Sequence, residues 1–296
     1  MRLIKASSPH IIKGGNKNKV MLMVFLALLP ATFAGGYFFG QQAILIILAS
    51  LISSWATDLG MQYLTKRHTY KINFSSLITG LLLALVLPPT APLWIPVLGS
   101  VFAVSIGKYA FGLGNSIFNP ALVGRAFLVV SWPEIMSRWI SPDGISSATP
   151  LAASVKPAYT QLFYGSIGGC IGETSALAIL IGGIFLLAYR IIDWRIPLAY
   201  IFTVGILSLI FGGDVLFQVL SGGLLIGAFF MATDYVTIPI TPRGRWIFAI
   251  GCGLLTFLFR FYSSMPEGVM YSILLMNAFS PLIERLTIPK PFGGEK

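Results

Sequence analysis

The feature that most constrains the fold is a series of long runs of apolar residues. Residues 20–39 contain no charged side chain, and a helix of about 20 residues spans the ~30 Å hydrocarbon layer of a membrane. With 56% hydrophobic and 10% charged residues among 296, the composition excludes a soluble domain of this size. Ten apolar segments can be distinguished, at residues 20–39, 43–63, 75–88, 93–111, 117–132, 174–189, 196–211, 215–233, 246–261 and 269–284. We therefore predict an all-α polytopic membrane protein with about ten transmembrane helices.

The distribution of lysine and arginine predicts how this bundle is oriented, because these residues accumulate in loops that stay in the cytoplasm. With the amino terminus inside, sixteen basic residues fall on the inner side and three on the outer side. The expected units are a cytoplasmic tail, a first five-span unit, an outer loop, a second five-span unit and a second cytoplasmic tail, at residues 1–19, 20–132, 133–170, 171–285 and 286–296. The expected location is the inner (plasma) membrane of the cell. Because the net charge of +10 is spread over the inner loops, no nucleic-acid partner is expected.

The two five-span units share a sequence pattern that indicates an internal repeat. Thr79-Gly80 in the third segment matches Ser221-Gly222 in the eighth, and Phe118-Asn119-Pro120 in the fifth resembles Phe279-Ser280-Pro281 in the tenth. Since five is odd, the second copy enters the membrane from the opposite side, which makes the repeats inverted. Chance similarity among glycine-rich apolar helices is the alternative. The glycines at residues 80 and 222–223 are expected to permit close helix packing.

Cysteine and histidine limit the cofactors that this chain can hold. Cys170 and Cys252 are the only cysteines and form no CxxC pair, so the chain alone does not hold an iron–sulfur cluster. His10 and His68 lie outside the apolar segments, so a bis-histidine haem within the membrane has no ligands. No metal site is expected, and any electron carrier must be of another kind.

The outer loop carries a threonine in a distinctive setting. The stretch from Asp143 to Thr149 contains Ser146 and Ala148, and Pro150 follows the threonine. Proline removes an amide donor and biases Thr149 toward extended backbone, which suits an enzyme that must reach the hydroxyl group. From local chemistry alone, an ordinary polar turn is the favoured interpretation of the stretch.

The pattern Asp143-x-x-Ser146-x-Ala148-Thr149 resembles the flavinylation motif of flavin transferases, which transfer FMN from FAD to the threonine hydroxyl as a phosphoester. Its position between the fifth and sixth spans resembles the family of Rnf electron-transport D subunits and, more distantly, the B subunits of sodium-translocating NADH:quinone reductases. The resemblance extends over nearly the whole chain, through stretches at residues 107–112, 118–121, 168–175, 232–242 and 275–282. Ser147 stands where glycine is common in the family, and the short N-terminal tail favours the Rnf assignment.

The resemblance implies a subunit of a redox-driven translocase that oxidises ferredoxin, reduces NAD and transports Na⁺ or H⁺. It implies FMN on Thr149 and a second, non-covalent flavin such as riboflavin in the bundle. The implied partners are the A, B, C, E and G type subunits, a flavin transferase during maturation and the lipid bilayer. Ferredoxin and NAD would bind other subunits, so the isolated chain is not expected to have complete activity.

Four ionisable residues at or near membrane depth are further candidates, because burying charge in a membrane is costly. Asp58 and Glu173 are candidates for the ion pathway, although both lie near span ends, where solvated or helix-capping roles are common. Arg125 is a candidate for binding a phosphate or an ion, or for a structural ion pair across the repeat. Lys108, beside Tyr109 and Phe111, either contacts a flavin or belongs to the aromatic belt at the membrane surface.

Three other functions remain open at this point. One is the flavin subunit of a sodium-translocating NADH:quinone reductase. Another is a urea-transporter-like channel, which an inverted five-span repeat also describes but which needs no flavin acceptor. The third is a scaffold subunit that has lost its cofactor. The Asp143–Thr149 pattern favours a flavoprotein over the channel.

Overall fold

The computed structural model describes residues 17–65, 73–112, 116–141, 151, 157–263 and 268–289. Every regular element that runs over more than one residue in these ranges is a helix, which confirms the predicted all-α class. Each of the ten predicted segments overlaps one or more of these helices. The structure differs from the predicted segments in three places. One helix runs over the first two segments, a π-helical turn follows the helix of the fourth segment, and residues 215–233 are divided into short helical pieces.

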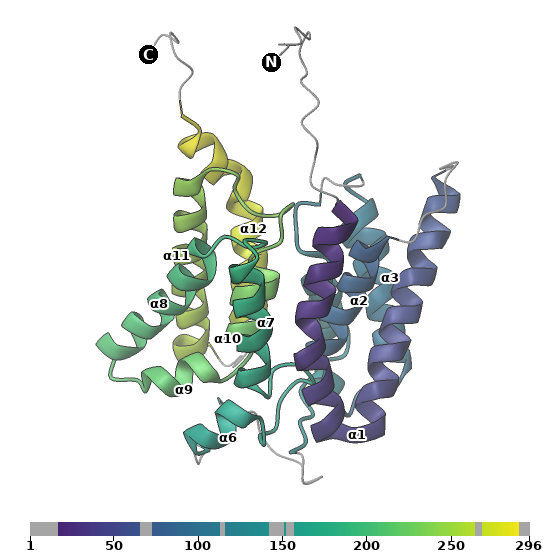
Figure 1. The fold of residues 1–296 in the computed structure, drawn as a ribbon, viewed down its shortest axis with the longest axis horizontal. Coiled ribbons are helices and arrows are strands. Elements are labelled where there is room, and N and C mark those ends of the chain that lie inside the picture. Colours follow the sequence, from purple (N-terminus) through teal and green to yellow (C-terminus); the bar gives the residue numbers. More distant parts are fainter. Residues whose placement is uncertain are drawn as a thin grey trace, which may run out of the picture.

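The first half contains five apolar stretches in four α-helices. α1 (Lys17–Leu64) covers the first two predicted segments, and Gly40 interrupts it with φ 66° and ψ −149°. Only glycine adopts this conformation readily, and the chain reverses there into a hairpin of two helical legs (Figure 1). α2 (Phe74–Leu85), α3 (Trp94–Val104) and α4 (Pro120–Ser131) follow. α3 continues directly into a π-helical turn, η1 (Ser105–Tyr109).

Two short helices lie between the halves, α5 (Pro133–Met136) and α6 (Tyr159–Tyr164). The second half begins with α7 (Ala176–Ala188) and α8 (Arg195–Ile210). It ends with the longer helices α11 (Pro242–Tyr262) and α12 (Gly268–Thr287). In Figure 1 the beginning of α1 and the end of α12 lie at one end of the molecule, and α6 and α9 lie at the other.

The predicted span at residues 215–233 is not one helix. It consists of α9 (Val215–Leu220), α10 (Leu224–Ile226) and the π-helical turn η2 (Gly227–Met231). Gly222 and Gly223 separate α9 from α10 with φ values of 64° and 69°. The two glycines make a left-handed turn, and the close approach predicted for them is to Leu151 and Glu173, which lie outside the helices.

The corresponding glycine of the first half does serve packing. A Cβ atom on Gly80 would overlap the Ser54 side chain and lie 2.7 Å from the Ser50 carbonyl oxygen of α1. The missing side chain therefore lets α2 approach α1 closely. The Ser50 hydroxyl uses this proximity and donates a 2.6 Å hydrogen bond to the Gly80 carbonyl oxygen.

The surface of the bundle is apolar on both halves. Large hydrophobic side chains point outward, among them Phe33, Leu209 and Leu282, which are 71%, 68% and 53% exposed. Two helices are long and apolar enough to cross a bilayer, Asn18–Leu64 and Pro242–Tyr262, and five shorter apolar helices accompany them. Water would disfavour so much outward-facing apolar surface, whereas lipid accommodates it. The chain is a membrane protein.

Candidate functional site

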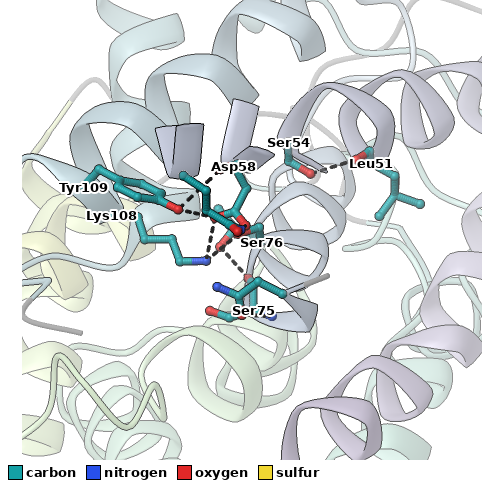
Figure 2. Close-up of polar contacts among 10 residues, drawn as sticks. Leu51, Ser54, Asp58, Ser75, Ser76, Lys108 and Tyr109 are labelled. Carbon is teal, nitrogen blue, oxygen red and sulfur yellow. Dashed lines mark hydrogen bonds and ion pairs between the residues drawn. The ribbon is translucent and has the colours of Figure 1, made fainter. Parts of the chain in front are cut away.

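A buried polar cluster lies where α1, α2 and η1 meet (Figure 2). Asp58 of α1 is 1% exposed, and its Oδ1 atom lies 3.7 Å from Nζ of Lys108. The Lys108 ammonium group also donates a hydrogen bond to the Ser76 hydroxyl. The Tyr109 hydroxyl donates to Oδ1 of Asp58 at 3.0 Å, and Nε2 of Gln62 donates to Oδ2 at 2.7 Å. Both oxygens of the buried carboxylate are therefore hydrogen-bonded, as a buried charge requires.

Local structure brings these side chains together. The π-helical turn η1 contains an extra residue per turn, and it directs the consecutive Lys108 and Tyr109 side chains to the same carboxylate. Ser76 lies in the first turn of α2, where the Asn73 side chain caps the helix by accepting a hydrogen bond from the Ser75 amide. The belt interpretation of Lys108 is wrong, because its side chain is buried and paired. The solvated interpretation of Asp58 is wrong for the same reason.

A small cavity adjoins this cluster and lies between the two halves. Its volume is about 110 Å³. The first half contributes Lys108, Asn73 and Asn119, and the second half contributes Thr233 and Asp234. The polar wall faces apolar side chains such as those of Phe229 and Phe230. The cavity can hold water or a small ion next to the buried lysine.

Two asparagines join the halves beside this cavity. Oδ1 of Asn277, in α12, accepts a 3.1 Å hydrogen bond from the Asn119 amide at the start of α4. The Asn119 side chain donates to the Met231 carbonyl oxygen at 3.0 Å, and the Asn277 side chain donates to that of Thr237 at 3.2 Å. These bonds satisfy main-chain groups at the broken helices of the second half, as an apolar surrounding demands.

A second buried ion pair lies apart from the first. Arg125 of α4 is 4% exposed and Glu173 is 8% exposed. Nη1 of Arg125 lies 3.3 Å from Oε1 of Glu173, and Nη2 donates to Sγ of Cys170 at 3.3 Å. The structural ion pair expected for Arg125 is thus present, and Glu173 is not solvated. A Cβ atom on Gly223 would lie 2.5 Å from Oε1 of Glu173, so the turn between α9 and α10 closes over this pair.

The loop that carries Glu173 is anchored on the first half. The Gly172 amide donates to the Leu85 carbonyl oxygen at 2.7 Å, and the Ile171 amide donates to that of Leu87 at 3.0 Å. Leu85 is the last residue of α2. The loop amides therefore donate to carbonyl groups at the end of the helix, which have no partner within the helix itself. The buried pair therefore depends on the contact between the halves.

The structure brings four of the predicted site residues into two pairs, Asp58 with Lys108 and Arg125 with Glu173. The flavinylation pattern, comprising Asp143, Ser146, Ala148 and Thr149, lies outside the described residues. The individual roles of all these residues stay predictions. Within the described ranges no group of three or more His, Cys, Asp and Glu side chains is placed to hold a metal ion.

The sequence interpretation assigned no role to several residues that the structure places at these sites. Ser76, Gln62 and Asp234 are among them, together with the Tyr109 hydroxyl and the Cys170 sulfur. Tyr109, Cys170 and Asp234 belong to stretches that carried the family resemblance. That membership was the one signal available for them. Ser76 and Gln62 had no signal, because isolated polar residues in apolar helices are common.

Known proteins resemble this chain from end to end. The family model described as "NQR2, RnfD, RnfE family" matches residues 4–293. The chain belongs to this family. The D subunit of the Na(+)-translocating ferredoxin:NAD(+) oxidoreductase complex of Acetobacterium woodii is 46% identical, over 100% of this chain and 97% of that protein. The D subunit of the proton-translocating ferredoxin:NAD(+) oxidoreductase complex of Clostridium ljungdahlii is 42% identical, over 98% and 96%. The D subunit of the ion-translocating oxidoreductase complex of Methanosarcina acetivorans is 36% identical, over 97% and 96%.

Membership of this family confirms the resemblance to Rnf D subunits. The matches cover 97% and 96% of the first two relatives. The family match gives no support to a urea-transporter-like channel. The relatives named above are subunits of complexes, as expected for this chain.

Proposed function

We propose that this chain is the D-type membrane subunit of an ion-translocating ferredoxin:NAD(+) oxidoreductase complex. The observation that carries the proposal is the 46% identity to the Acetobacterium woodii protein over the entire chain. The other subunits, of A, B, C, E and G type, would bind ferredoxin and NAD and complete the activity. The chain alone would carry electrons without a complete reaction.

Membrane vesicles from cells that lack this chain test the proposal. Ferredoxin-dependent NAD reduction and the accompanying ion uptake should both disappear, and expression of the wild-type chain should restore both. Unchanged activity without the chain would contradict the assignment.

The ten predicted crossings would form two inverted five-span repeats. Two features support this arrangement. A hydroxyl pair joins the second and fourth segments of each half: Ser50 to Ser100 at 2.9 Å, and Tyr200 to Thr256 at 2.6 Å. The fifth and tenth segments, which share the aromatic-polar-proline pattern, meet through Asn119 and Asn277. The repeat would place the polar cavity between the two copies, where such folds bind their ions.

The proposed orientation puts both termini in the cytoplasm and residues 133–170 outside, in the inner (plasma) membrane. The opposite ends at which α12 finishes and α6 lies support it (Figure 1). A membrane-impermeant maleimide tests it, because both native cysteines are buried. Added outside intact cells, the reagent should label Thr160→Cys and spare Leu286→Cys. The reverse labelling would refute the orientation.

The cofactor proposed for the outer loop is FMN, bound through a phosphoester to Thr149 after modification by a flavin transferase. Support for this placement comes from Leu151, which follows the flavinylation pattern and lies within the described residues. Leu151 packs against Leu162, Ile167 and Phe217, so the chain next to the pattern is fixed at the end of the molecule where α6 lies. Bound FMN would supply the redox chemistry, while Asp143, Ser146, Ala148 and Thr149 would provide the recognition and the covalent attachment.

In-gel fluorescence of the denatured protein tests the attachment, because only covalent flavin survives denaturation. Wild-type chain expressed with the transferase should fluoresce, and Thr149→Ala should not. Thr160→Ala is the matched control, since Thr160 is an exposed threonine of α6 in the same loop, and it should fluoresce like the wild type. Fluorescence that persists in Thr149→Ala would place the flavin elsewhere.

A second flavin such as riboflavin is not supported by the polar cavity. Its volume of about 110 Å³ is below the ~300–1,000 Å³ that is usual for small-molecule sites. Lys108 is bonded within the protein instead of being directed at a ligand. We assign no step to such a flavin.

Asp58 and Glu173 are the carboxylates that we propose for the ion pathway. Support comes from their burial within the bundle, since ionisable side chains at membrane depth are costly and mark ion pathways. The double variant Asp58→Asn, Lys108→Gln removes the first carboxylate without leaving an unpaired charge. Ion uptake should fall relative to electron transfer in vesicles that contain the complex, whereas Glu134→Gln, which removes an exposed carboxylate, should keep the wild-type ratio. Equal ratios in all three would remove Asp58 from the pathway.

A further inference from the structure

A basic cavity adjoins the polar cavity described above, with which it shares Ile192, Thr233 and Tyr235. It has a volume of about 720 Å³, within the ~300–1,000 Å³ range of small-molecule sites. It opens between the turn that joins α7 to α8 and the segment that precedes α11. Three arginines and one aspartate line it: Arg190, Arg195, Arg245 and Asp193.

The positive charge of this cavity is only partly neutralised. Nη1 of Arg195 and Nη1 of Arg245 both donate to the same oxygen of Asp193, at 3.0 Å and 2.5 Å. Arg190 is exposed, and its guanidinium group forms no ion pair with any residue in the described ranges. The lining thus contains three arginines and one aspartate, an excess of positive charge that attracts an anion.

Arg190 also has an unusual backbone. It is the one described residue other than glycine with a positive φ, 53°. The Ile191 amide donates to the Leu186 carbonyl oxygen at 2.9 Å and the Arg190 amide to that of Leu187 at 3.0 Å, which is the usual end of a helix with a left-handed residue. Glycine is the residue favoured at such a position, because a side chain there costs energy. Arginine thus stands at a position where glycine would be less costly.

The surroundings place the cavity at the surface of the membrane. It lies at the end of the apolar helix α7 and at the start of α8. Trp194 and Tyr235 line it and are 51% and 45% exposed. The Trp194 ring packs edge-on against Trp246 with a centroid distance of 5.9 Å. Exposed tryptophan and tyrosine side chains concentrate at the level of lipid headgroups.

The walls of the cavity are connected to one another. The Tyr235 hydroxyl donates to the Ile191 carbonyl oxygen, which joins the segment before α11 to the turn after α7. Nε of Arg245 donates to the Pro239 carbonyl oxygen at 3.3 Å. Arg195 and Arg245 are therefore held in place before any ligand binds, which lowers the entropy cost of binding.

We propose that this cavity binds the phosphate of an anionic phospholipid headgroup, with Arg190 as the residue that selects for net negative charge. Guanidinium groups match phosphate oxygens in charge and in hydrogen-bond geometry. Basic pockets between transmembrane helices at the cytoplasmic surface are suited to such headgroups. The aromatic side chains around the cavity favour a lipid over a soluble phosphate compound.

Native mass spectrometry of the delipidated full-length chain in detergent tests this proposal. Dioleoylphosphatidylglycerol is the anionic probe, dioleoylphosphatidylcholine the zwitterionic one, and sodium phosphate the soluble one. The wild type should bind the first phosphatidylglycerol about tenfold more tightly than phosphatidylcholine, a factor that corresponds to ~1.4 kcal/mol. Sodium phosphate at millimolar concentration should not displace the lipid.

Three variants separate the side chain from its surroundings. Arg190→Gly relieves the backbone strain and should lower the affinity for phosphatidylglycerol about tenfold without lowering the melting temperature. Arg190→Lys keeps the charge and the strained backbone, and should keep the preference for the anionic lipid. Arg243→Gln removes a nearby exposed charge that does not line the cavity, and should leave the affinity unchanged.

Four results would overturn the proposal. The wild type would bind both lipids equally, or Arg243→Gln would weaken binding as much as Arg190→Gly does. Sodium phosphate would displace the lipid, which would make the cavity a site for a free anion. In the assembled complex, Arg190→Gly would release another subunit and leave lipid binding intact, which would make the cavity a protein interface.

Discussion

The Arg125–Glu173 pair gives the sharpest test of how the two halves are held together. Both side chains are at least nine-tenths buried, and their charged atoms are 3.3 Å apart. At an effective dielectric constant of about 20, Coulomb's law gives an attraction of roughly 5 kcal/mol at this distance. Much of that attraction only repays the cost of removing both charges from water. Deleting one partner should therefore cost far more than deleting both.

Glu173→Gln leaves the Arg125 guanidinium buried without its carboxylate partner, and arginine cannot lose its proton. We expect this variant to lose about 3–5 kcal/mol of unfolding free energy. Arg125→Met leaves a carboxylate, which can bind a proton, so its loss should be smaller. The double variant Arg125→Met, Glu173→Gln should be more stable than Glu173→Gln alone.

Unfolding of the purified chain in mixed detergent micelles, followed by circular dichroism, measures all four proteins of this double-mutant cycle. The interaction energy should exceed about 1 kcal/mol, well above the ~0.3–0.5 kcal/mol uncertainty of additivity for separate sites. Additive losses from the two single variants would show that the two charges do not interact. A loss below about 1 kcal/mol for Glu173→Gln would show that water reaches the pair.

Three further predictions concern the turn, the surface and the core. Gly223→Ala should lose at least ~1–2 kcal/mol of unfolding free energy, because its φ is 69° and a Cβ atom would meet Glu173. Its control is Gly60→Ala, inside α1 with open space around it, which should gain ~0.5–1 kcal/mol in the same unfolding assay. Burial raises the pKa of Asp193, but hydrogen bonds from the Arg195 amide and the guanidinium groups of Arg245 and Arg195 outweigh it and hold the pKa below the usual 3.8. The stability advantage over Asp193→Asn should therefore be complete above about pH 5, decline as the pH falls through the folded pKa, and be absent once both states are protonated; an advantage that grows toward acid would contradict this sign. Tyr200→Phe should cost only ~0.5–1.5 kcal/mol, because Thr256 and Ser272 keep their mutual 2.7 Å bond, and a loss above about 3 kcal/mol would mean that the hydroxyl triad acts as one unit.

Hydropathy alone predicted where nearly all the helices are. Each apolar segment, such as residues 246–261, overlaps a helix of the structure, here α11 (Pro242–Tyr262). A chain in lipid must satisfy its main-chain hydrogen bonds internally, so an apolar segment has little choice but to form a helix. The same local rule did not predict the break at Gly222 and Gly223, because isolated glycines also occur within continuous helices.

The candidate sites depended on distances that the sequence does not contain. Asp58 and Glu173 were recognisable as costly charges, yet their positions near segment ends suggested contact with water. The structure buries both. Lys108 beside Tyr109 had the appearance of a membrane-surface pair, and only the π-helical turn η1 directs both side chains inward to Asp58.

The sequence by itself determined the helical class, the membrane environment and the family, because each of these depends on composition, periodicity or matched stretches along the chain. Only the tertiary structure decided which charges neutralise one another. Arg125 and Glu173 are 48 positions apart, and Tyr109 and Asp58 are 51 apart. A buried charge requires a partner at hydrogen-bonding distance. The apolar packing of whole helices decides which side chain lies at that distance, and this packing is not directional.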